Sequence, residues 1–392
     1  MTLSSNSSLQ CLRPAELQTP VAFCLFNRPA ETARVFAAIR EARPAKLILV
    51  ADGPRDHHPQ DRAKVAAARA AVAQVDWDCE VIREYSERNL GTGRRVASGL
   101  DRVFSLVEEA IILEDDCLPD ASFFRFCTEL LDRYRSDPRV MMVSGTNNLV
   151  KWKEREQDYH FSQYGSIWGW ATWRRAWQHY EFSLPSLDDN SVRTRVAASL
   201  KDEEQFERLT QGCDQARSGQ LDTWDYQWDW TRLAQGGVAA VSAVNLITNI
   251  GFSAAATHTV HYNLLTAGMT RFAAPSVLRP NPNVAADSEY DRQWFLRMDS
   301  RPEFHSIINQ GLALLEQGRH IHALIFFQET AKIRPELAEL HYYASLALAR
   351  LGRHPQALES LERFRRLCPE HEGGRLLFAE LSAAAEQARR SS

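Results

Sequence analysis

The sequence predicts an α/β protein with a mostly parallel sheet and flanking helices, followed by a small all-α repeat region. Short apolar runs alternate with helical segments between residues 21 and 144, as is typical of parallel strands joined by helices. A 34-residue period then marks the C-terminal part. At roughly 100–200 residues per domain, the 392 residues correspond to two or three domains.

The strands and helices of the α/β part are predicted from apolar runs and helical spacing. Strands are expected at 21–26, 46–51, 79–84, 110–113 and 140–144, and helices at 31–42, 61–74, 94–107 and 121–135. Ligands of such sheets bind beyond the carboxyl ends of the strands, so the polar residues that follow these runs are the first candidates for a site. The uncharged stretch 234–257 contains Asn, Gln and Gly, which favours two buried strands with a turn over a membrane helix.

The composition is that of an ordinary globular protein, with 44% hydrophobic and 24% charged residues. The net charge of −4 argues against nucleic-acid binding, which needs a basic surface. The seven cysteines form no Cys-x-x-Cys motif, which argues against a disulfide framework or a zinc ribbon. The first 20 residues lack the apolar core of a signal peptide, so we expect a cytoplasmic protein, with peripheral association at the inner face of the membrane left open.

The C-terminal region repeats with a period of 34 residues. The matching pairs are Gly318 and Gly352, Arg319 and Arg353, His320 and His354, Ala323 and Ala357, Leu324 and Leu358, and Pro335 and Pro369. This pattern resembles the tetratricopeptide repeat, here at 304–337 and 338–371, with a capping helix at about 375–388. Such repeats form concave peptide-binding surfaces, so a protein partner is expected there, with an ordinary pair of helical hairpins as the alternative.

These patterns together divide the chain into three predicted parts. A tail is expected at 1–18, a larger α/β domain at 19–300, and the repeat domain with its capping helix at 304–390.

Three consecutive carboxylates, Glu114, Asp115 and Asp116, follow the predicted strand at 110–113. Adjacent carboxylates repel one another, and a hard divalent cation such as Mg²⁺ or Mn²⁺ removes that cost. We therefore expect a divalent metal carrying a diphosphate here, and a solvated turn is the alternative.

Two further segments add to this site. Asp52 and Gly53 close the strand at 46–51, and the sequence Asn-Leu-Gly-Thr-Gly-Arg-Arg at 89–95 opens a helix. Glycines at a helix start let backbone amides approach an anion, and paired arginines neutralise a diphosphate. The glycine spacing fits neither a Walker loop nor G-x-G-x-x-G, so kinase and dehydrogenase functions lose their main support. A plain turn remains the alternative for this segment.

These motifs together resemble the GT-A-fold nucleotide-diphospho-sugar glycosyltransferases. The likeness rests on Asn27-Arg28-Pro29, Asp52-Gly53-Pro54, Asn89-Leu90-Gly91 and Glu114-Asp115-Asp116, and it covers about residues 18–300. The chain is most similar to bacterial glycosyltransferase-like proteins labelled hemolytic-protein-like. It is more distantly similar to the type I N-acetylglucosaminyltransferases, which also carry Glu-Asp-Asp. The segments 164–173, 223–228 and 249–252 add to the bacterial likeness.

The resemblance implies a role for each matching residue. Asp52 would hydrogen-bond the nucleotide base, and Arg94 or Arg95 would meet the diphosphate. Asp115 and Asp116 would face the sugar diphosphate, with Asp116 as the direct metal ligand. The other donor-side residues would be Asn27, Arg28, Gly53, Asn89, Gly91 and Glu114.

A late histidine also reaches the metal in many enzymes of this fold. His258 fits that role better than His261, because it lies nearer the segment 249–252. A structural histidine is the alternative.

Sugar transfer by an inverting enzyme needs a carboxylate base for the acceptor hydroxyl. In the N-acetylglucosaminyltransferase-like enzymes a Trp-Asp-Asp-Trp segment carries this base, and Asp225 is the matching candidate here. One Asp of that segment is replaced by Tyr-Gln in this chain, so Asp222 and Asp229 remain alternatives. Inversion itself is implied only by this distant likeness.

Aromatic residues could bind the acceptor, because flat rings bury the apolar face of a sugar. The candidates are Tyr164, Trp168, Trp170 and Trp173. Core packing is the alternative for the same residues, since large aromatic side chains dominate protein cores.

We therefore expect a metal-dependent glycosyltransferase of hexosyl or N-acetylhexosaminyl type, acting on a nucleotide-diphosphate sugar. Its acceptor would be a glycan, a lipid-linked sugar or a protein. A non-catalytic scaffold with a decayed transferase domain is one alternative, and the intact acidic triplet argues against it. A nucleotidyltransferase is another, and it would carry a Gly-rich loop where this chain has Asn27-Arg28-Pro29.

Overall fold

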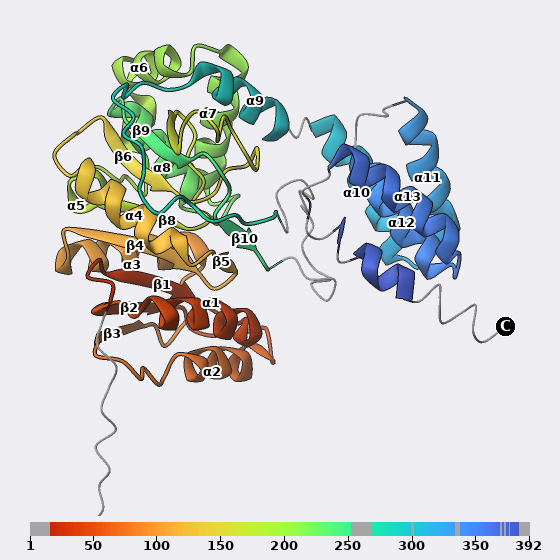
Figure 1. Cartoon of the computed structure of the whole chain (residues 1–392), viewed down its shortest axis with the longest axis horizontal. Coiled ribbons are helices and arrows are strands. Elements are labelled where there is room, and N and C mark those ends of the chain that lie inside the picture. Colours follow the sequence, from red (N-terminus) through yellow and green to blue (C-terminus); the bar gives the residue numbers. More distant parts are fainter. Residues whose placement is uncertain are drawn as a thin grey trace, which may run out of the picture.

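A mixed sheet lies at the centre of the larger part of the molecule in the computed structural model (Figure 1). The structure describes residues 16–251, 269–298, 302–333, 338–368, 371, 374–375 and 377–383, without the side chains of 296–298, 302–307, 309 and 333. Within this described part the sheet strands are β1 (Val21–Leu25), β2 (Lys46–Ala51), β3 (Glu80–Tyr85), β4 (Glu109–Glu114), β6 (Val140–Ser144), β7 (Tyr159–Ser162), β8 (Trp170–Trp173) and β9 (Val238–Ser242).

The strand order is β3-β2-β1-β4-β8-β6-β9-β7. The strands β3, β2, β1 and β4 pair in parallel, and so do β6 and β9. The strands β8 and β7 run antiparallel to their neighbours. A small two-stranded sheet pairs β5 (Cys117–Pro119) with β10 (Ile247–Asn249). The carboxyl ends of β1, β2 and β4 therefore meet at one edge.

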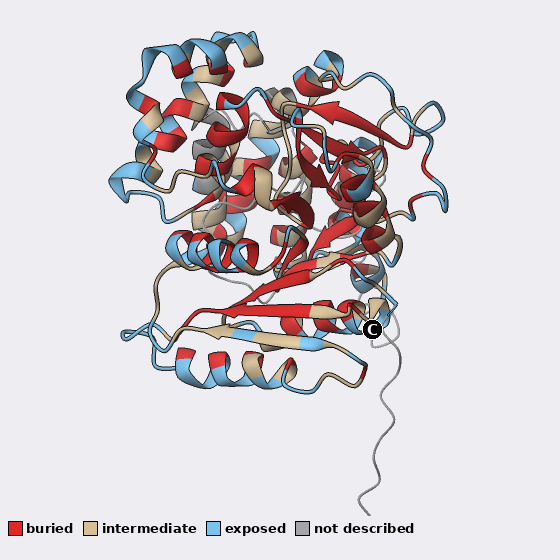
Figure 2. Cartoon of the chain, turned by 90° about the vertical axis from the view of Figure 1, so that its left-hand side faces the viewer, coloured by how far each residue is buried: buried red, intermediate tan, exposed pale blue. Residues whose placement is uncertain are grey.

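Helices cover both faces of the sheet. One face packs against α1 (Pro29–Ala42), α2 (Asp61–Ala71) and α4 (Ser122–Arg133). The other face packs against α3 (Thr92–Leu106), α5 (Arg174–Trp177) and α8 (Asp225–Ala234). The central strands are buried on both sides, whereas β3 at the edge is partly exposed (Figure 2). Strands buried on both sides read as continuous apolar runs, which explains why the sequence revealed them.

The remaining helices of the α/β part belong to a separate, smaller cluster or follow later in the chain. The elements η1 (Pro185–Asp188), α6 (Asn190–Leu200) and α7 (Glu203–Ser218) form a smaller cluster with α8. The helix α9 (Ser288–Met298) follows later in the chain.

The predicted α/β class with a mostly parallel sheet is confirmed. Each predicted strand forms, and the ends of the predicted helices shift by a few residues. The uncharged stretch near 240 forms β9 and β10, as expected. The strand β8 was not predicted, because its insertion between β4 and β6 is a long-range pairing that local apolar periodicity does not encode.

The C-terminal region is α-helical (blue in Figure 1). It contains α10 (Pro302–Glu316), α11 (His320–Ile333), α12 (Ala338–Arg350) and α13 (His354–Leu367), which share their own core. Ala323 and Ala357, which the 34-residue period relates, are both fully buried in that core. The assignment to tetratricopeptide repeats and the domain boundaries stay predictions.

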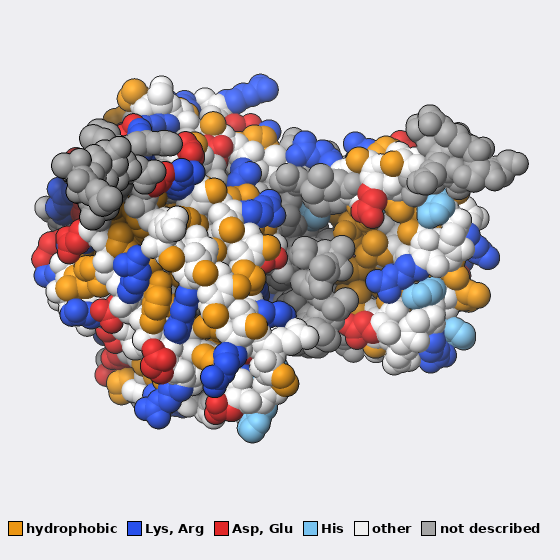
Figure 3. All heavy atoms as spheres, turned by 90° about the horizontal axis from the view of Figure 1, so that it is seen from below, with side chains coloured by type: hydrophobic (Ala, Val, Ile, Leu, Met, Phe, Trp, Pro, Cys, Tyr) orange, Lys and Arg blue, Asp and Glu red, His pale blue; other side chains and the backbone are white. Residues whose placement is uncertain are grey.

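The helical region contacts the α/β part near its C-terminal end. Met269 forms a β-bridge with His371, and Arg375 Nη2 donates to Thr270 Oγ1 at 3.3 Å. Acidic and basic side chains are intermixed with hydrophobic ones on the face of the molecule that Figure 3 shows. In the described part of the chain, no helix is long and apolar enough to cross a bilayer.

Candidate active site

A cavity of about 200 Å³ opens at the carboxyl ends of β1, β2 and β4. We call it the strand-end cleft. Its ionisable lining groups include Asp52, Arg55, Arg95, Glu114, Asp115 and Asp222, and Asn89 and Gly91 border it as well. The polar residues that follow three separate apolar runs thus come together, because parallel strands end at the same edge of the sheet.

The acidic triplet lies where β4 ends, and its carboxylates have different partners. Asp115 Oδ2 accepts a hydrogen bond from Phe26 N at 2.9 Å. Asp116 Oδ2 lies 2.5 Å from Arg28 Nη1, which is also 3.4 Å from Asp115 Oδ1. Asp116 Oδ1 accepts a weak hydrogen bond from Cys117 Sγ at 3.4 Å.

Glu114 is half-buried, and its buried Oε1 has no hydrogen-bond partner in the described structure. Burial, together with the charges of Asp116, Asp115 and Asp225, raises the pKa of Glu114 from 4.5 to about 8. Burial also raises the pKa of Asp115, whereas Arg28 opposes that shift. The triplet therefore does not carry three full negative charges at neutral pH.

Replacing Glu114 with glutamine is expected to change how stability depends on pH. Between about pH 4.5 and 8 the unfolded chain ionises Glu114 while the folded chain keeps it protonated, so the wild type loses stability as pH rises through this window. The glutamine side chain has no proton to lose, so Glu114→Gln should gain stability relative to wild type across the window. Urea unfolding at pH 5 and pH 8 measures this, and an unchanged difference between the two proteins would contradict the assignment.

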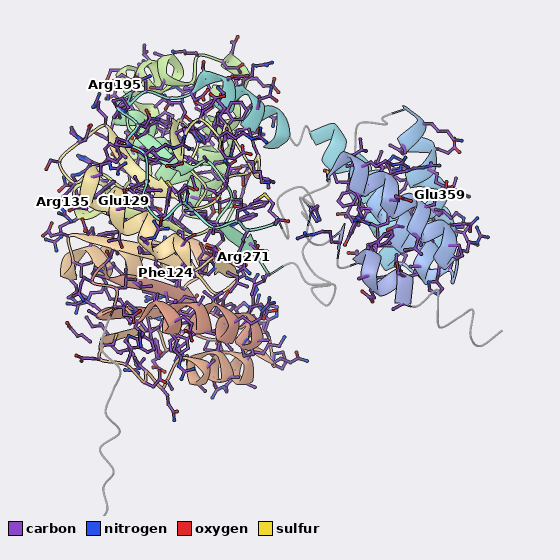
Figure 4. All side chains as sticks on the ribbon, viewed as in Figure 1. Phe124, Glu129, Arg135, Arg195, Arg271 and Glu359 are labelled. Carbon is purple, nitrogen blue, oxygen red and sulfur yellow. The ribbon has the colours of Figure 1, made fainter. Side chains whose placement is uncertain are left out.

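The segment that follows β10 frames Asp116. Ile250 N donates to Asp116 O at 2.7 Å, and Gly251 N donates to Asn249 Oδ1 at 2.9 Å. A Cβ at Gly251 would lie 2.5 Å from Asp116 Oδ2, so the carboxylate needs glycine at this position. Arg271, which lies beside β10 in Figure 4, donates to the carbonyls of Leu118 and Pro119 and holds the next segment on β5.

Asp52 organises the loop before α3. Its carboxylate accepts hydrogen bonds from Gly53 N, Leu90 N, Gly91 N and Asn89 Nδ2, at 2.8 to 3.2 Å. A carboxylate has about four positions at which it can accept a hydrogen bond, and these four donors occupy all of them in Asp52. The structure therefore gives Asp52 a positioning role in this loop, and its hydrogen bond with a nucleotide base stays a prediction. A Cβ at Gly53 would lie 2.5 Å from the backbone of Arg88, so there is no space for a side chain at this position.

The N-terminus of α3 is already capped by a carboxylate. Asp222 Oδ2 accepts from Thr92 N at 2.8 Å, and Asp222 Oδ1 accepts from Gly93 N at 2.9 Å. Gly91 has φ of +82°, and a Cβ there would lie 2.6 Å from Asp222 Oδ2. The sequence predicts that backbone amides at this helix start bind a phosphate. In the structure the amides of Thr92 and Gly93 already donate to Asp222, so these two amides do not serve that purpose.

Three residues predicted to bind the donor, Arg94, Arg95 and Asn27, lie in different surroundings. Arg95 lines the strand-end cleft and donates from Nη2 to Glu84 O at 2.7 Å. Arg94 turns away and lies over the ring of Phe182, 5.1 Å from its centre. Asn27 Nδ2 donates to Asp61 Oδ1 at 2.9 Å and thus supports the loop of Asp61 and Arg55. Of the two arginines, Arg95 is the one placed to meet a ligand.

The three base candidates have different surroundings. Asp222 caps α3, and Asp229 is paired with the fully buried Arg232 at 2.6 Å. Asp225 begins α8 and accepts hydrogen bonds from Thr223 Oγ1 and from Tyr226 N. Its charge acts on Glu114, so it lies near the acidic triplet. Of the three, Asp222 lines the strand-end cleft, and Asp225 is the candidate that neither caps α3 nor pairs with a buried arginine among the described residues.

The aromatic candidates divide between core and surface. Trp170 is fully buried and Trp173 is 2% exposed, so their predicted contact with an acceptor sugar is wrong. Both side chains fill the core that surrounds β8. Trp168 is half-buried, and Tyr164 stacks on Trp294 with ring centres 3.9 Å apart while its hydroxyl donates to Gln205.

The described residues supply only some of the ligands that a divalent metal needs. No group of three His, Cys, Asp or Glu side chains in this part of the chain is arranged to hold an ion. Asp116 is 9% exposed and offers carboxylate oxygens, and Mg²⁺ commonly takes one or two carboxylates together with phosphate oxygens. The site thus fits a metal that arrives with a diphosphate. His258 lies outside the described residues.

Two positions in this site escaped the sequence-based prediction. From the sequence, Asp222 is only a candidate base and Gly251 has no role of its own, because both act through contacts with residues more than 100 positions away in sequence. The acidic residue before a tryptophan-rich helix was the only signal for Asp222. No local signal marks Gly251 as the neighbour of Asp116.

Comparisons with known proteins give fold-level likeness alone. No family model and no curated protein matches the sequence. Among solved structures, the UTP-bound UGPase from Acinetobacter baumannii has 10% identity and a TM-score of 0.32, over 60% of this chain and 89% of that chain. The apo form of mouse xyloside xylosyltransferase 1 has 11% identity and a TM-score of 0.27, over 55% and 81%. A UDP-glucose pyrophosphorylase complexed with UDP-glucose has 7% identity and a TM-score of 0.30, over 60% and 94%. Scores this low carry no argument about the activity of this chain.

Proposed function

We propose that this protein is a metal-dependent glycosyltransferase that moves a sugar from a nucleotide-diphosphate donor to an acceptor hydroxyl. One observation carries the proposal. Asp115 and the loop organised by Asp52 line the strand-end cleft, Asp116 shares Arg28 with Asp115, and the charge of Asp225 acts on Glu114, which lines the same cleft. That combination supplies negative groups for a metal diphosphate and a separate carboxylate for proton transfer.

In the proposed reaction Asp225 is the general base. Its carboxylate takes the proton of the acceptor hydroxyl while the acceptor oxygen forms a bond to the anomeric carbon. The bond from that carbon to the diphosphate oxygen breaks, and its electron pair leaves with the diphosphate. The hydrogen bond from Thr223 Oγ1 orients Asp225, and Arg95 neutralises phosphate charge. A bound Mg²⁺ or Mn²⁺ would stabilise the leaving charge.

A single displacement of this kind inverts the anomeric centre, so we propose an inverting enzyme. The donor sugar would be of hexosyl or N-acetylhexosaminyl type. The acceptor would be a glycan, a lipid-linked sugar or a protein, bound on the side of Tyr164 and Trp168. We propose a cytoplasmic location, where nucleotide sugars are supplied.

The helical region would bind a protein partner or present a protein acceptor. A cavity of about 510 Å³ lies between α11, α12 and α13, and Phe327, Ala344 and Arg363 are among its lining residues. Glu359, labelled on α13 in Figure 4, also lines it and pairs with Arg363 at 2.9 Å. The mixture of apolar and charged groups suits a peptide with both kinds of side chain.

A thermal-shift panel of nucleotide-diphosphates and nucleotide sugars, with and without Mn²⁺, tests the proposal on wild type and Asp116→Ala. A ligand at 100 times its Kd should stabilise the protein by about 2.7 kcal/mol, and Asp116→Ala should lose the metal-dependent part. Asp132→Ala, at an exposed position of α4, is the matched control and should respond as wild type.

The outcomes of this panel separate the competing functions. No shift with any nucleotide would refute the transferase proposal and would favour a scaffold that works through its helical region. A product that forms only from a sugar phosphate and a nucleoside triphosphate, with release of pyrophosphate, would identify a nucleotidyltransferase. The short connection from β1 to α1 leaves room only for residues 26–28, which favours the glycosyltransferase.

A further inference from the structure

The cation in contact with the acidic pair is a side chain of this protein. Arg28 Nη1 lies 2.5 Å from Asp116 Oδ2 and 3.4 Å from Asp115 Oδ1. The side chains alone of Asp116 and Asp115 are 13% and 8% exposed, so this contact is largely shielded from water on their side. Among the ion pairs of the described residues, no other Lys, Arg or His reaches either carboxylate.

Arg28 has a fixed backbone and a partly exposed side chain. Arg28 O accepts from Thr32 N at 2.8 Å and from Thr32 Oγ1 at 2.7 Å, which anchors the residue to the first turn of α1. Pro29 restricts the backbone further at the helix start. The side chain is 46% exposed, so the guanidinium can leave the acidic pair without any backbone change.

We propose that Arg28 occupies the Asp116 oxygen that a divalent metal would use, so that Arg28 and the metal compete for Asp116. This inference takes the identity of the metal site from the proposed function. A cation already in contact with Asp116 Oδ2 neutralises the carboxylate, and it must be displaced before an ion can coordinate the same oxygen. The protein alone is therefore a poor metal binder.

The competition has a consequence for ligand binding. A guanidinium released from Asp116 is a favourable partner for a diphosphate, because arginine binds phosphate oxygens through paired hydrogen bonds. A diphosphate that attracts Arg28 makes Asp116 available, so the metal and the diphosphate favour each other's binding. Coupling of this kind is reciprocal between the two ligands.

The test is a titration of the full-length protein with Mn²⁺ alone, with free Mn²⁺ measured by electron paramagnetic resonance. Wild type is compared with Arg28→Gln, which keeps a polar side chain and removes the charge. We expect Arg28→Gln to bind Mn²⁺ about 5-fold tighter or more, the lower end of typical coupling between sites. Arg28→Lys should bind with intermediate affinity, because it keeps the charge without the planar guanidinium.

Two controls link the gain in affinity to Asp116. Arg94→Gln makes the same charge change near the cleft, but Arg94 lies over Phe182, so this variant should bind Mn²⁺ as wild type does. The double variant Arg28→Gln with Asp116→Asn should lose the gain. Circular dichroism verifies that each variant is folded, and Arg28→Lys provides a second comparison if Arg28→Gln unfolds.

The outcomes are distinct from those that test the enzyme activity. Equal or weaker Mn²⁺ binding by Arg28→Gln overturns the inference, and so does a gain that persists without Asp116. If Arg28→Gln binds Mn²⁺ more tightly through Asp116 while no nucleotide binds wild type, the competition stands and the proposed transferase function falls.

Discussion

Replacing Asp225 with asparagine is expected to lower kcat for sugar transfer by about 10²- to 10⁴-fold, with little change in KM for the donor. Asparagine keeps the shape of the side chain, and its amide oxygen can still accept the hydrogen bonds from Thr223 Oγ1 and Tyr226 N. It cannot take a proton from an acceptor hydroxyl. The loss should therefore appear in the chemical step and not in nucleotide binding.

Steady-state kinetics with a donor found in the nucleotide panel measure this effect. Asp214→Asn on α7 is the matched control, because Asp214 is an exposed carboxylate paired with Arg217, and its replacement should leave kcat within about twofold. Asp229→Asn tests the remaining candidate, and its main effect should be on stability, since it leaves the fully buried Arg232 without its carboxylate. A normal kcat for Asp225→Asn would remove Asp225 from the mechanism.

Replacing Trp170 with alanine is expected to lower the free energy of unfolding by about 3–5 kcal/mol. Trp170 is fully buried, and its ring lies 5.5 Å from that of Trp224 and 5.7 Å from that of Trp228, centre to centre. Alanine removes the ring from this cluster and leaves a cavity that a packed core closes only in part. Because Trp224 directly precedes Asp225, the substitution also loosens the start of α8.

Urea unfolding followed by circular dichroism measures the loss. Trp168→Ala is the comparison, since Trp168 is half-buried and its removal should cost clearly less. Trp170→Phe provides a second comparison, because it keeps an aromatic ring and removes an indole N–H that has no partner in the described structure. A loss below about 1 kcal/mol for Trp170→Ala would contradict the core assignment and would reopen the acceptor-binding role.

The agreement between sequence and structure is best where the signal is local. The strands β1, β2 and β4 are continuous apolar runs, and the residues that follow them reach one edge because the strands are parallel. The sequence therefore predicts Asp52, Glu114 and Asp115 at one site, and all three line the strand-end cleft. Their individual contacts were not predicted, since hydrogen-bond partners depend on side-chain positions.

The disagreements concern side chains with two plausible environments. A tryptophan in a Trp-rich segment suits either a sugar site or a core, and only the insertion of β8 between β4 and β6 buries Trp170 and Trp173. Glycines before a helix suit either a phosphate or another cap, and only the approach of the loop before α8 brings Asp222 onto α3.

The sequence by itself determined the α/β class, the positions of its first strands along the chain and the group of polar residues at the strand ends, because apolar periodicity is a property of short segments. Tertiary structure alone decided which carboxylates have partners. Asp52 accepts hydrogen bonds from loop amides, and Asp222 caps α3. Asp116 pairs with Arg28, and the charge of Asp225 acts on Glu114 of the acidic triplet. These contacts join residues up to 130 positions apart, and no local pattern encodes them, because their geometry arises only when the sheet and its helices pack together.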